Sequence, residues 1–151
     1  MKKYEIGLYE KAMRNTLTWK EKLQCAKECG YDYLEISIDA TEEKINRIYM
    51  DTEEKREIME AIFDTGIPIG SMSVSALTKY ALGDPDQAVR DRGMEIAEKS
   101  IQLSSALGVR TVMIPGYDIY YGESTIETKR YFLENIRKIA EIAEREGILV
   151  G

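Results

Sequence analysis

The sequence predicts an α/β protein in which parallel strands alternate with helices, and three observations predict it. Glycines that can end a helix recur at intervals of 36, 42 and 39 residues, at Gly30, Gly66, Gly108 and Gly147. An apolar, strand-like run follows each glycine, as expected where a left-handed residue turns the chain out of a helix. Residues that favour helix starts precede each helical run. Strands alternating with helices predict a parallel sheet with right-handed crossovers.

The elements are expected in a regular order along the chain. Strands are predicted at residues 4–9, 31–38, 67–74, 109–115 and 148–150. Capping-box spacings predict four helix starts, at Thr18 with Glu21, Asp51 with Glu54, Asp84 with Gln87, and Ser124 with Glu127. Pro85 follows Asp84 directly, where a first-turn proline is favoured.

The alternation of side chains within the strands indicates which parallel fold this is. In the second strand Leu34, Ile36 and Ile38 share one face, whereas Glu35 and Ser37 share the other. Strands of doubly wound sheets are buried on both faces and read as continuous apolar runs, whereas a small, polar face is typical of a (β/α)8 barrel lumen. A whole barrel needs about 250 residues. Residues 1–151 are therefore expected to be a single domain forming half of a TIM barrel, with four βα units and the start of a fifth strand.

Composition and charge narrow the function classes. The chain has 21 basic and 27 acidic residues and a net charge of −6, which argues against nucleic acid and anionic membranes as partners. No stretch approaches the length of a transmembrane helix. The first ten residues lack the apolar core of a secretory signal, which favours a cytoplasmic protein.

The sequence lacks the residues of several common catalytic sites. It has no histidine, which excludes Ser-His-Asp and Cys-His mechanisms within this chain. Cys25 and Cys29 lie four residues apart in a helical segment. They could be a redox pair or half of a metal site, but packing is the favoured interpretation, since a metal site needs about four ligands. Glycine-rich nucleotide loops and nucleophile elbows are also absent.

Candidate functional residues lie at the carboxyl ends of the strands, where (β/α)8 barrels place their active sites. They are Tyr9, Glu10, Lys11, Glu35, Ser37, Asp39, Ser73, Ser75, Gly116, Tyr117 and Asp118. Glu35 is either a ligand contact or a structural partner of a nearby lysine or hydroxyl, with the structural role slightly favoured. The tyrosine-rich segment 116–123 could line a sugar pocket or pack on the barrel rim. The serines could bind a hydroxylated ligand, or fill space as small residues.

Two long loops follow the second and third strands. Residues 39–50 are expected to form a short helix over the mouth of the barrel, and residues 75–84 could form a lid.

Five segments of the chain resemble one known family. They are GLYEKA (7–12), GYDYLEISID (30–39), TGIPIGSMSVSA (65–76), residues 82–121, and residues 127–148. In order and content these resemble the N-terminal half of the L-ribulose-5-phosphate (L-xylulose-5-phosphate) 3-epimerases of the xylose isomerase-like barrel group. The resemblance covers essentially the whole chain.

The resemblance implies a reaction, and it implies which half of the barrel holds the catalytic residues and which binds the substrate. It implies removal and return of the proton at C3 of a pentulose 5-phosphate by two glutamates, with a divalent metal ion bound to the sugar oxygens. It places the metal ligands and both glutamates on the fifth to eighth strands, so that this chain holds no catalytic residue and no metal ligand. What it assigns to this chain is a substrate-binding wall of Tyr9, Glu10, Glu35, Ser73, Ser75, Gly116 and Tyr117.

The chain departs from the family pattern at two positions. A histidine is common after the serine and alanine of the third-strand loop, where this chain has Leu77, and an acidic residue often follows Asp39, where it has Ala40. Loss of the histidine removes an expected substrate contact.

Three functions remain open from the sequence. The first is half of a sugar-phosphate epimerase that is inactive alone. The second is a half-barrel that closes as a homodimer through its open edges. The third is a sugar-binding relative without chemistry.

Overall fold

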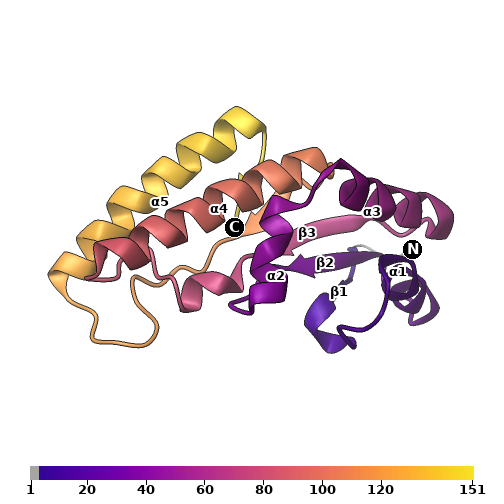
Figure 1. The fold of residues 1–151 in the computed structure, drawn as a ribbon, viewed down its shortest axis with the longest axis horizontal. Helices are drawn as coiled ribbons and strands as arrows, with labels where there is room; N and C mark the ends of the chain where they lie inside the picture. The colour runs from indigo at the N-terminus through magenta and orange to yellow at the C-terminus, as the bar shows by residue number, and fades with distance from the viewer. Residues whose placement is uncertain (1–3) are drawn as a thin grey trace.

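The computed structural model describes residues 4–151, which form one parallel sheet flanked by helices (Figure 1). The sheet has five strands in the order β1-β2-β3-β4-β5, which is also their order in the chain. Strands added successively in one direction are typical of a barrel, whereas a doubly wound sheet reverses direction at a switch point. The predicted half-barrel of four βα units and a fifth strand is confirmed. The elements are β1 (Gly7–Tyr9), η1 (Glu10–Ala12), α1 (Trp19–Glu28), β2 (Tyr33–Ser37), α2 (Glu42–Asn46), η2 (Arg47–Tyr49), α3 (Thr52–Thr65), β3 (Ile69–Ser73), η3 (Ser75–Thr78), α4 (Gln87–Ala106), β4 (Thr111–Met113), α5 (Ile126–Glu146) and β5 (Leu149–Val150).

The glycine turns lie where the sequence predicted them. Gly30, Gly66, Gly108 and Gly147 have φ angles of 79°, 73°, 72° and 66°. These values lie in the left-handed region that glycine enters without steric cost. Each turn ends one helix and directs the chain into the next strand, which fixes the period of the fold.

Two of the four predicted helix starts are confirmed. Thr18 and Asp51 form capping boxes at the starts of α1 and α3. The prediction for α4 was wrong by two residues: Asp86 is its N-cap and accepts a hydrogen bond from the amide of Ala88 at 2.9 Å. Asp84 instead accepts one from the amide of Asp86 at 2.8 Å, so Pro85 precedes the N-cap.

The predicted start of α5 was wrong by one residue. Thr125 is the N-cap and forms a reciprocal pair with Thr128. The hydroxyl of Ser124 donates to the Asp118 carboxylate at 2.8 Å instead. Two adjacent residues could each cap this helix, and the contact with the preceding loop decides between them.

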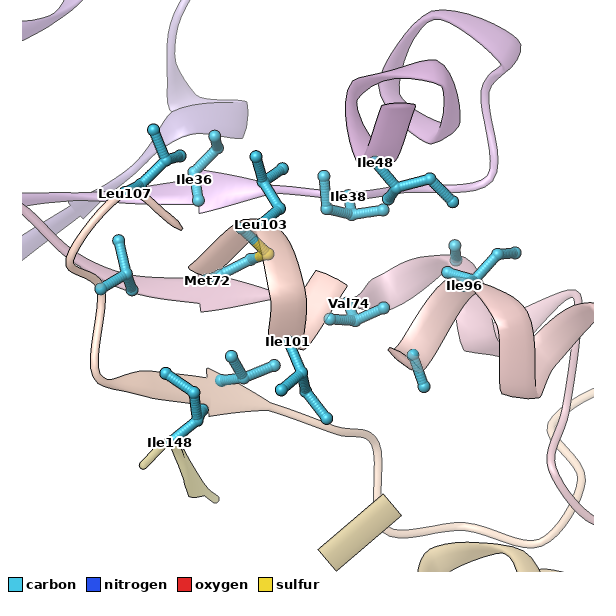
Figure 2. Packing of buried hydrophobic residues seen from close by; sticks show 14 of the residues in the cluster. Ile36, Ile38, Ile48, Met72, Val74, Ile96, Ile101, Leu103, Leu107 and Ile148 are labelled. Atoms are coloured by element: carbon cyan, nitrogen blue, oxygen red, sulfur yellow. The ribbon is translucent and has the colours of Figure 1, made fainter. Parts of the chain in front are cut away.

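The hydrophobic core lies between the sheet and its outer helices. Figure 2 shows side chains of β2 and β3 pointing toward those of α4. The fully buried members include Leu34, Ile36, Ile38, Met72, Val74, Ile96 and Ile101. The apolar face predicted from the alternation of β2 and β3 is therefore the core face.

The opposite face of the sheet carries polar side chains, and the ring of Tyr33 lies on it near the start of the strands. A Cβ atom added to Gly7 would lie 2.2 Å from the ring of Tyr33, and one added to Gly70 would lie 2.5 Å from it. The register between β2 and β3 shifts at this level, since Leu34 pairs with Ile69 and Glu35 with Ser71, which leaves Gly70 as the extra residue. The two glycines make room for the Tyr33 ring across three strands.

Both residues of the last strand, β5, are exposed. Ile148 is 5 % exposed, but Leu149 is 69 % and Val150 36 % exposed. In the described part of the chain β5 pairs with β4 alone, so its second edge has no neighbour. Residues 4–151 include no helix that is both long and apolar enough to cross a membrane.

Candidate functional site

The ends of β1, β2 and β3 bring five of the predicted candidates together. The hydroxyls of Tyr9 and Ser37 lie 3.3 Å apart. The Lys11 ammonium donates to the Ser75 hydroxyl at 3.2 Å and pairs with the Asp39 carboxylate at 3.3 Å. Parallel strands end at one edge of the sheet, which is why residues up to 64 positions apart meet here. We call this edge, defined by Tyr9, Lys11, Ser37, Asp39 and Ser75, the mouth.

The mouth stabilises negative charge on its acidic groups. Burial raises the pKa of Tyr9, but hydrogen bonds with Ser37, Ser75 and Ser73 and the charge on Lys11 outweigh it, so the pKa lies below its ordinary value. Burial likewise raises the pKa of Asp39, and the bonds from Thr41 and Lys11 more than offset it. The site therefore presents hydroxyls and the Lys11–Asp39 ion pair, donors and acceptors that suit a ligand rich in hydroxyl groups.

Glu10 does not line the mouth as the sequence predicted. Its side chain is fully buried and makes three ion pairs: with the ammonium groups of Lys22 and Lys44 at 2.7 Å each, and with the Arg47 guanidinium at 2.6 Å. It also accepts a hydrogen bond from the amide of Ser37 at 2.9 Å. We call Glu10, Lys22, Lys44 and Arg47 the Glu10 cluster. The oxygens of Glu10 are thus occupied by protein donors, and a ligand role for Glu10 stays a prediction.

The Glu10 cluster ties four elements to the end of β2. Lys22 comes from α1, Lys44 from α2 and Arg47 from η2, while Glu10 opens η1 directly after Tyr9. Figure 1 shows α2 beside the arrowhead end of β2, as expected for a short helix over the mouth. The Trp19 ring packs against two of the cations, with its centroid 4.8 Å from the Lys22 ammonium and 4.8 Å from the Arg47 guanidinium carbon.

The pKa values within the cluster reflect the crowding of cations around one carboxylate. Burial raises the pKa of Glu10, but the hydrogen bond and charge of Arg47, with the bonds from Lys22 and Lys44, hold it well below its usual range. The pKa of Lys44 lies below its ordinary value. Burial lowers it most, and the charges of Arg47 and Lys22 lower it further, whereas the hydrogen bond and charge of Glu10 raise it.

Glu35 and the third-strand serines face the lumen, as predicted. The Ser71 hydroxyl donates to the Glu35 carboxylate at 2.6 Å, which is the structural partnership that the sequence favoured. Ser73 is 7 % exposed and lies opposite Ser37 in the strand register. A ligand role for Glu35 and Ser73 stays a prediction.

Gly116 and Tyr117 belong to a separate part of the rim. The ring of Tyr117 packs against that of Tyr120, with centroids 5.0 Å apart, and Tyr120 packs against Tyr121 at 4.7 Å. Asp118 accepts a hydrogen bond from the Thr128 hydroxyl at 2.5 Å. These contacts support the rim-packing interpretation of the tyrosine segment, and a ligand role for Gly116 and Tyr117 also stays a prediction.

The loop at residues 75–84 is anchored rather than free. Leu77, Ala81 and Leu82 are each 2 % exposed. A Cβ atom added to Gly93 of α4 would lie 2.3 Å from the Tyr80 carbonyl oxygen, so the loop packs closely on that helix. Leu77, which replaces the expected histidine, therefore contributes to the core.

The described residues do not form a metal centre. Within residues 4–151, no three His, Cys, Asp or Glu side chains are grouped so as to hold a metal ion. Cys25 is partly buried and Cys29 is exposed, and both are free thiols. The donor set present here does not fit the divalent ion that the resemblance implies for the longer enzyme.

The cations of the Glu10 cluster were not found from the sequence. Lys22, Lys44 and Arg47 lie in amphipathic segments rich in charge, where such residues are usually solvated. Their convergence depends on the packing of α1, α2 and η2 around the end of β2, which the sequence pattern does not show.

Comparison with known proteins agrees with this geometry. The family model described as the xylose isomerase-like TIM barrel matches residues 23–151. The chain belongs to this family. Solved structures similar in fold include a D-psicose 3-epimerase in the presence of D-fructose (TM-score 0.75, 19 % identity, 97 % of this chain and 51 % of that one). They also include a xylose isomerase-like TIM barrel protein from Mycobacterium smegmatis in complex with magnesium (TM-score 0.70, 14 % identity, 98 % and 54 %).

Curated relatives are more similar in sequence. The chain is 39 % identical over 150 residues to the L-ribulose-5-phosphate 3-epimerase UlaE of Escherichia coli O139:H28, covering 99 % of this chain and 53 % of that protein. It is 38 % identical over 150 residues to UlaE of Shigella boydii, again covering 99 % of this chain and 53 % of that protein. The chain thus spans about half the length of the relatives that it matches.

Proposed function

We propose that the chain is the substrate-binding half of a pentulose-5-phosphate 3-epimerase. The observation that carries this proposal is the identity of 39 % over 99 % of the chain to relatives named L-ribulose-5-phosphate 3-epimerase. The hydroxyls gathered at the mouth support it, because a ketose presents several hydroxyls in fixed directions. Each could exchange a hydrogen bond with Tyr9 or Ser75, which are both partly exposed.

The residues of the mouth would bind and orient the sugar rather than move its proton. The hydroxyl of the partly exposed Tyr9 lies 3.3 Å from that of the fully buried Ser37, so Ser37 can orient the phenol that would bond a ligand hydroxyl. Lys11, whose side chain is 41 % exposed, can release Ser75 and donate to a ligand oxygen. Holding the ketose in one pose lowers the entropic cost of the later proton transfer.

The chemistry of the epimerisation would come from the other half of the barrel. The family resemblance places there the two glutamates that exchange the C3 proton. A divalent metal ion held there would stabilise the enediolate charge. We therefore expect the 151-residue chain alone to be inactive.

Complementation tests this proposal. The chain is mixed with a separately produced C-terminal half of a UlaE relative and assayed for epimerisation of L-ribulose 5-phosphate, with each half alone as control. The proposal expects activity in the mixture and none in either half. It expects Tyr9→Phe to raise KM more than it lowers kcat. A mixture that forms a stable complex without activity would contradict it.

A homodimeric half-barrel is the second candidate, favoured by the exposed edge at β5. Leu149 is 69 % exposed beside a groove of about 480 Å³, lined by Ala140, Ala143, Ile148 and Val150 among others. Two copies related by a two-fold axis could pair the β5 edge of one with the β1 edge of the other and cover this groove.

Light scattering at low and high concentration tests the dimer. The candidate expects a mass of two chains and expects Leu149→Lys to give monomers, because a charge at the edge opposes pairing. Phe63→Lys is the matched control, since Phe63 is 89 % exposed on α3. An identical dimer in the Leu149 variant would count against closure through β5.

A further inference from the structure

The Glu10 cluster carries more positive than negative charge. Three cations surround one carboxylate, which gives the four side chains a formal charge of +2. Buried charges are normally paired, because uncompensated charge in a protein interior is costly. An excess of two buried cations therefore needs a reason other than the stability of the ion pairs.

The excess charge is shielded from water. The side chains of Lys22 and Lys44 are 3 % and 1 % exposed, and that of Arg47 is 10 % exposed. Ions in solution screen buried charges much less than exposed ones. The cluster is thus a persistent positive region in a chain whose net charge is −6.

The cluster lies directly behind the mouth. Glu10 accepts a hydrogen bond from the Ser37 amide at 2.9 Å, and Arg47 donates to the Ser37 carbonyl at 3.2 Å. The hydroxyl of the same residue is 3.3 Å from Tyr9. Ser37 is itself fully buried, so a ligand bonded to the partly exposed Tyr9 lies one hydrogen bond away from the residue that Glu10 and Arg47 hold.

We propose that the Glu10 cluster makes the mouth select phosphorylated ketoses over neutral ones. The inference rests on the proposed function and adds the residues that set its substrate class. Glu10 gathers three cations that would otherwise repel one another, and their excess charge attracts a dianionic phosphate. Arg47 is the most exposed of the three, and its guanidinium has further N–H groups to offer a phosphate oxygen.

Ligand selectivity of the 151-residue chain tests the inference. Dissociation constants for L-ribulose 5-phosphate and for L-ribulose are measured by isothermal titration calorimetry, and their ratio is the readout. Lys22→Met removes one cation with little change in volume and leaves Glu10 paired with Lys44 and Arg47. Lys44→Met is a second variant that removes a different cation. Lys20→Met is the matched control, because Lys20 lies on the same helix but pairs with Asp64 at 2.7 Å.

The inference expects the unaltered chain to prefer the phosphorylated ketose by at least roughly tenfold. It expects Lys22→Met and Lys44→Met each to reduce that preference about threefold to tenfold with little effect on L-ribulose. Lys20→Met should leave the ratio unchanged. A purely structural cluster would lower the melting temperature of both variants without changing the ratio, and that result overturns the inference.

Two other results would also overturn it: equal affinity of the unaltered chain for both ketoses, and no binding of either ketose at millimolar concentration. Neither bears on the complementation assay, because activity of the assembled barrel measures the proposed function independently.

Discussion

The two ends of the sheet differ in how far their side chains are buried and bonded within the chain. At β1 and β2 the Glu10 carboxylate is fully buried and bonded by four groups of this chain. At β4 and β5 the side chains of Met113 and Leu149 are 43 % and 69 % exposed, and Tyr121, in the loop that follows β4, is 78 % exposed. Within residues 4–151, both regions end in an unpaired strand edge, at β1 and at β5, but only the first encloses a cluster of buried ion pairs.

This difference shows where each region obtains its stability. The β1–β2 end adds a small number of buried polar contacts, each of which costs much to break, to the core packing of Leu34, Ile36 and Ile38. The β4–β5 end depends on core packing behind the sheet and leaves its front available for another surface. Substitutions should therefore be severe in the first region and mild in the second.

The largest effect is expected from Glu10→Ala. The change leaves Lys22, Lys44 and Arg47 crowded together without their shared carboxylate. Breaking a buried ion pair by removing one partner costs about 3–5 kcal/mol. Urea denaturation should show this loss, whereas Glu53→Ala, which removes a 62 % exposed partner of Arg56, should change stability by less than about 0.5 kcal/mol. Similar losses in both variants would show that the cluster contributes no more than surface pairs.

Acid should weaken the same region. The pKa of Glu10 is lower in the folded chain than in the unfolded chain, so its contribution is complete above the unfolded pKa of about 4.3. The contribution is lost as the pH falls below that value toward the folded pKa. Glu10→Gln, which cannot titrate, should lose less stability than the unaltered chain between neutral and acid pH in urea titrations. If the free energy of unfolding fell equally with pH in the variant and in the unaltered chain, the titration of Glu10 would not contribute to the loss of stability in acid.

An intermediate effect is expected from Gly70→Ala. The new methyl group would lie 2.5 Å and 2.6 Å from Cδ2 and Cγ of Tyr33, at the base of the ring where it cannot swing away. Overpacking of this kind costs about 1–3 kcal/mol, measurable by thermal or urea denaturation. Gly116→Ala is the matched control in the other region, since nothing lies within 4 Å of its added Cβ. A larger loss of stability in Gly116→Ala than in Gly70→Ala would contradict the expectation that substitutions are more severe in the first region.

The smallest effect is expected from Tyr121→Ser. Its ring makes an edge contact with Tyr120, with centroids 4.7 Å apart, but is otherwise largely in solvent. Stability should change by no more than about 0.5 kcal/mol in the same denaturation assay. A loss above about 1.5 kcal/mol would show that the tyrosine loop is as tightly coupled to the core as the mouth.

The fold could be predicted because its signals are local. Positive-φ glycines after each helix and alternation within the strands repeat with the βα unit, and each depends on a few adjacent residues. The errors occurred where two residues, adjacent or two positions apart, could each cap the same helix. Asp84 and Asp86 can both cap α4, and the chain path in three dimensions selects Asp86.

The candidate site was predicted only in part. The rule that strands of a barrel end at one edge was sufficient to group Tyr9, Ser37 and Ser75. The rule placed Glu10 at the same edge, but its side chain turns into the protein, where Lys22 and Lys44 reach it from 12 and 34 residues away.

By itself the sequence determined the period of the fold and the core face of its strands, since short-range backbone and patterning rules govern both. The edge at which a ligand would bind stays a prediction. Only the tertiary structure decided which charged residues are buried together. The pairing of Glu10 with Lys22, Lys44 and Arg47 depends on how three separate helical segments pack around the end of one strand. Contacts between residues so far apart in the sequence do not follow from the periodic patterns that predict helices and strands.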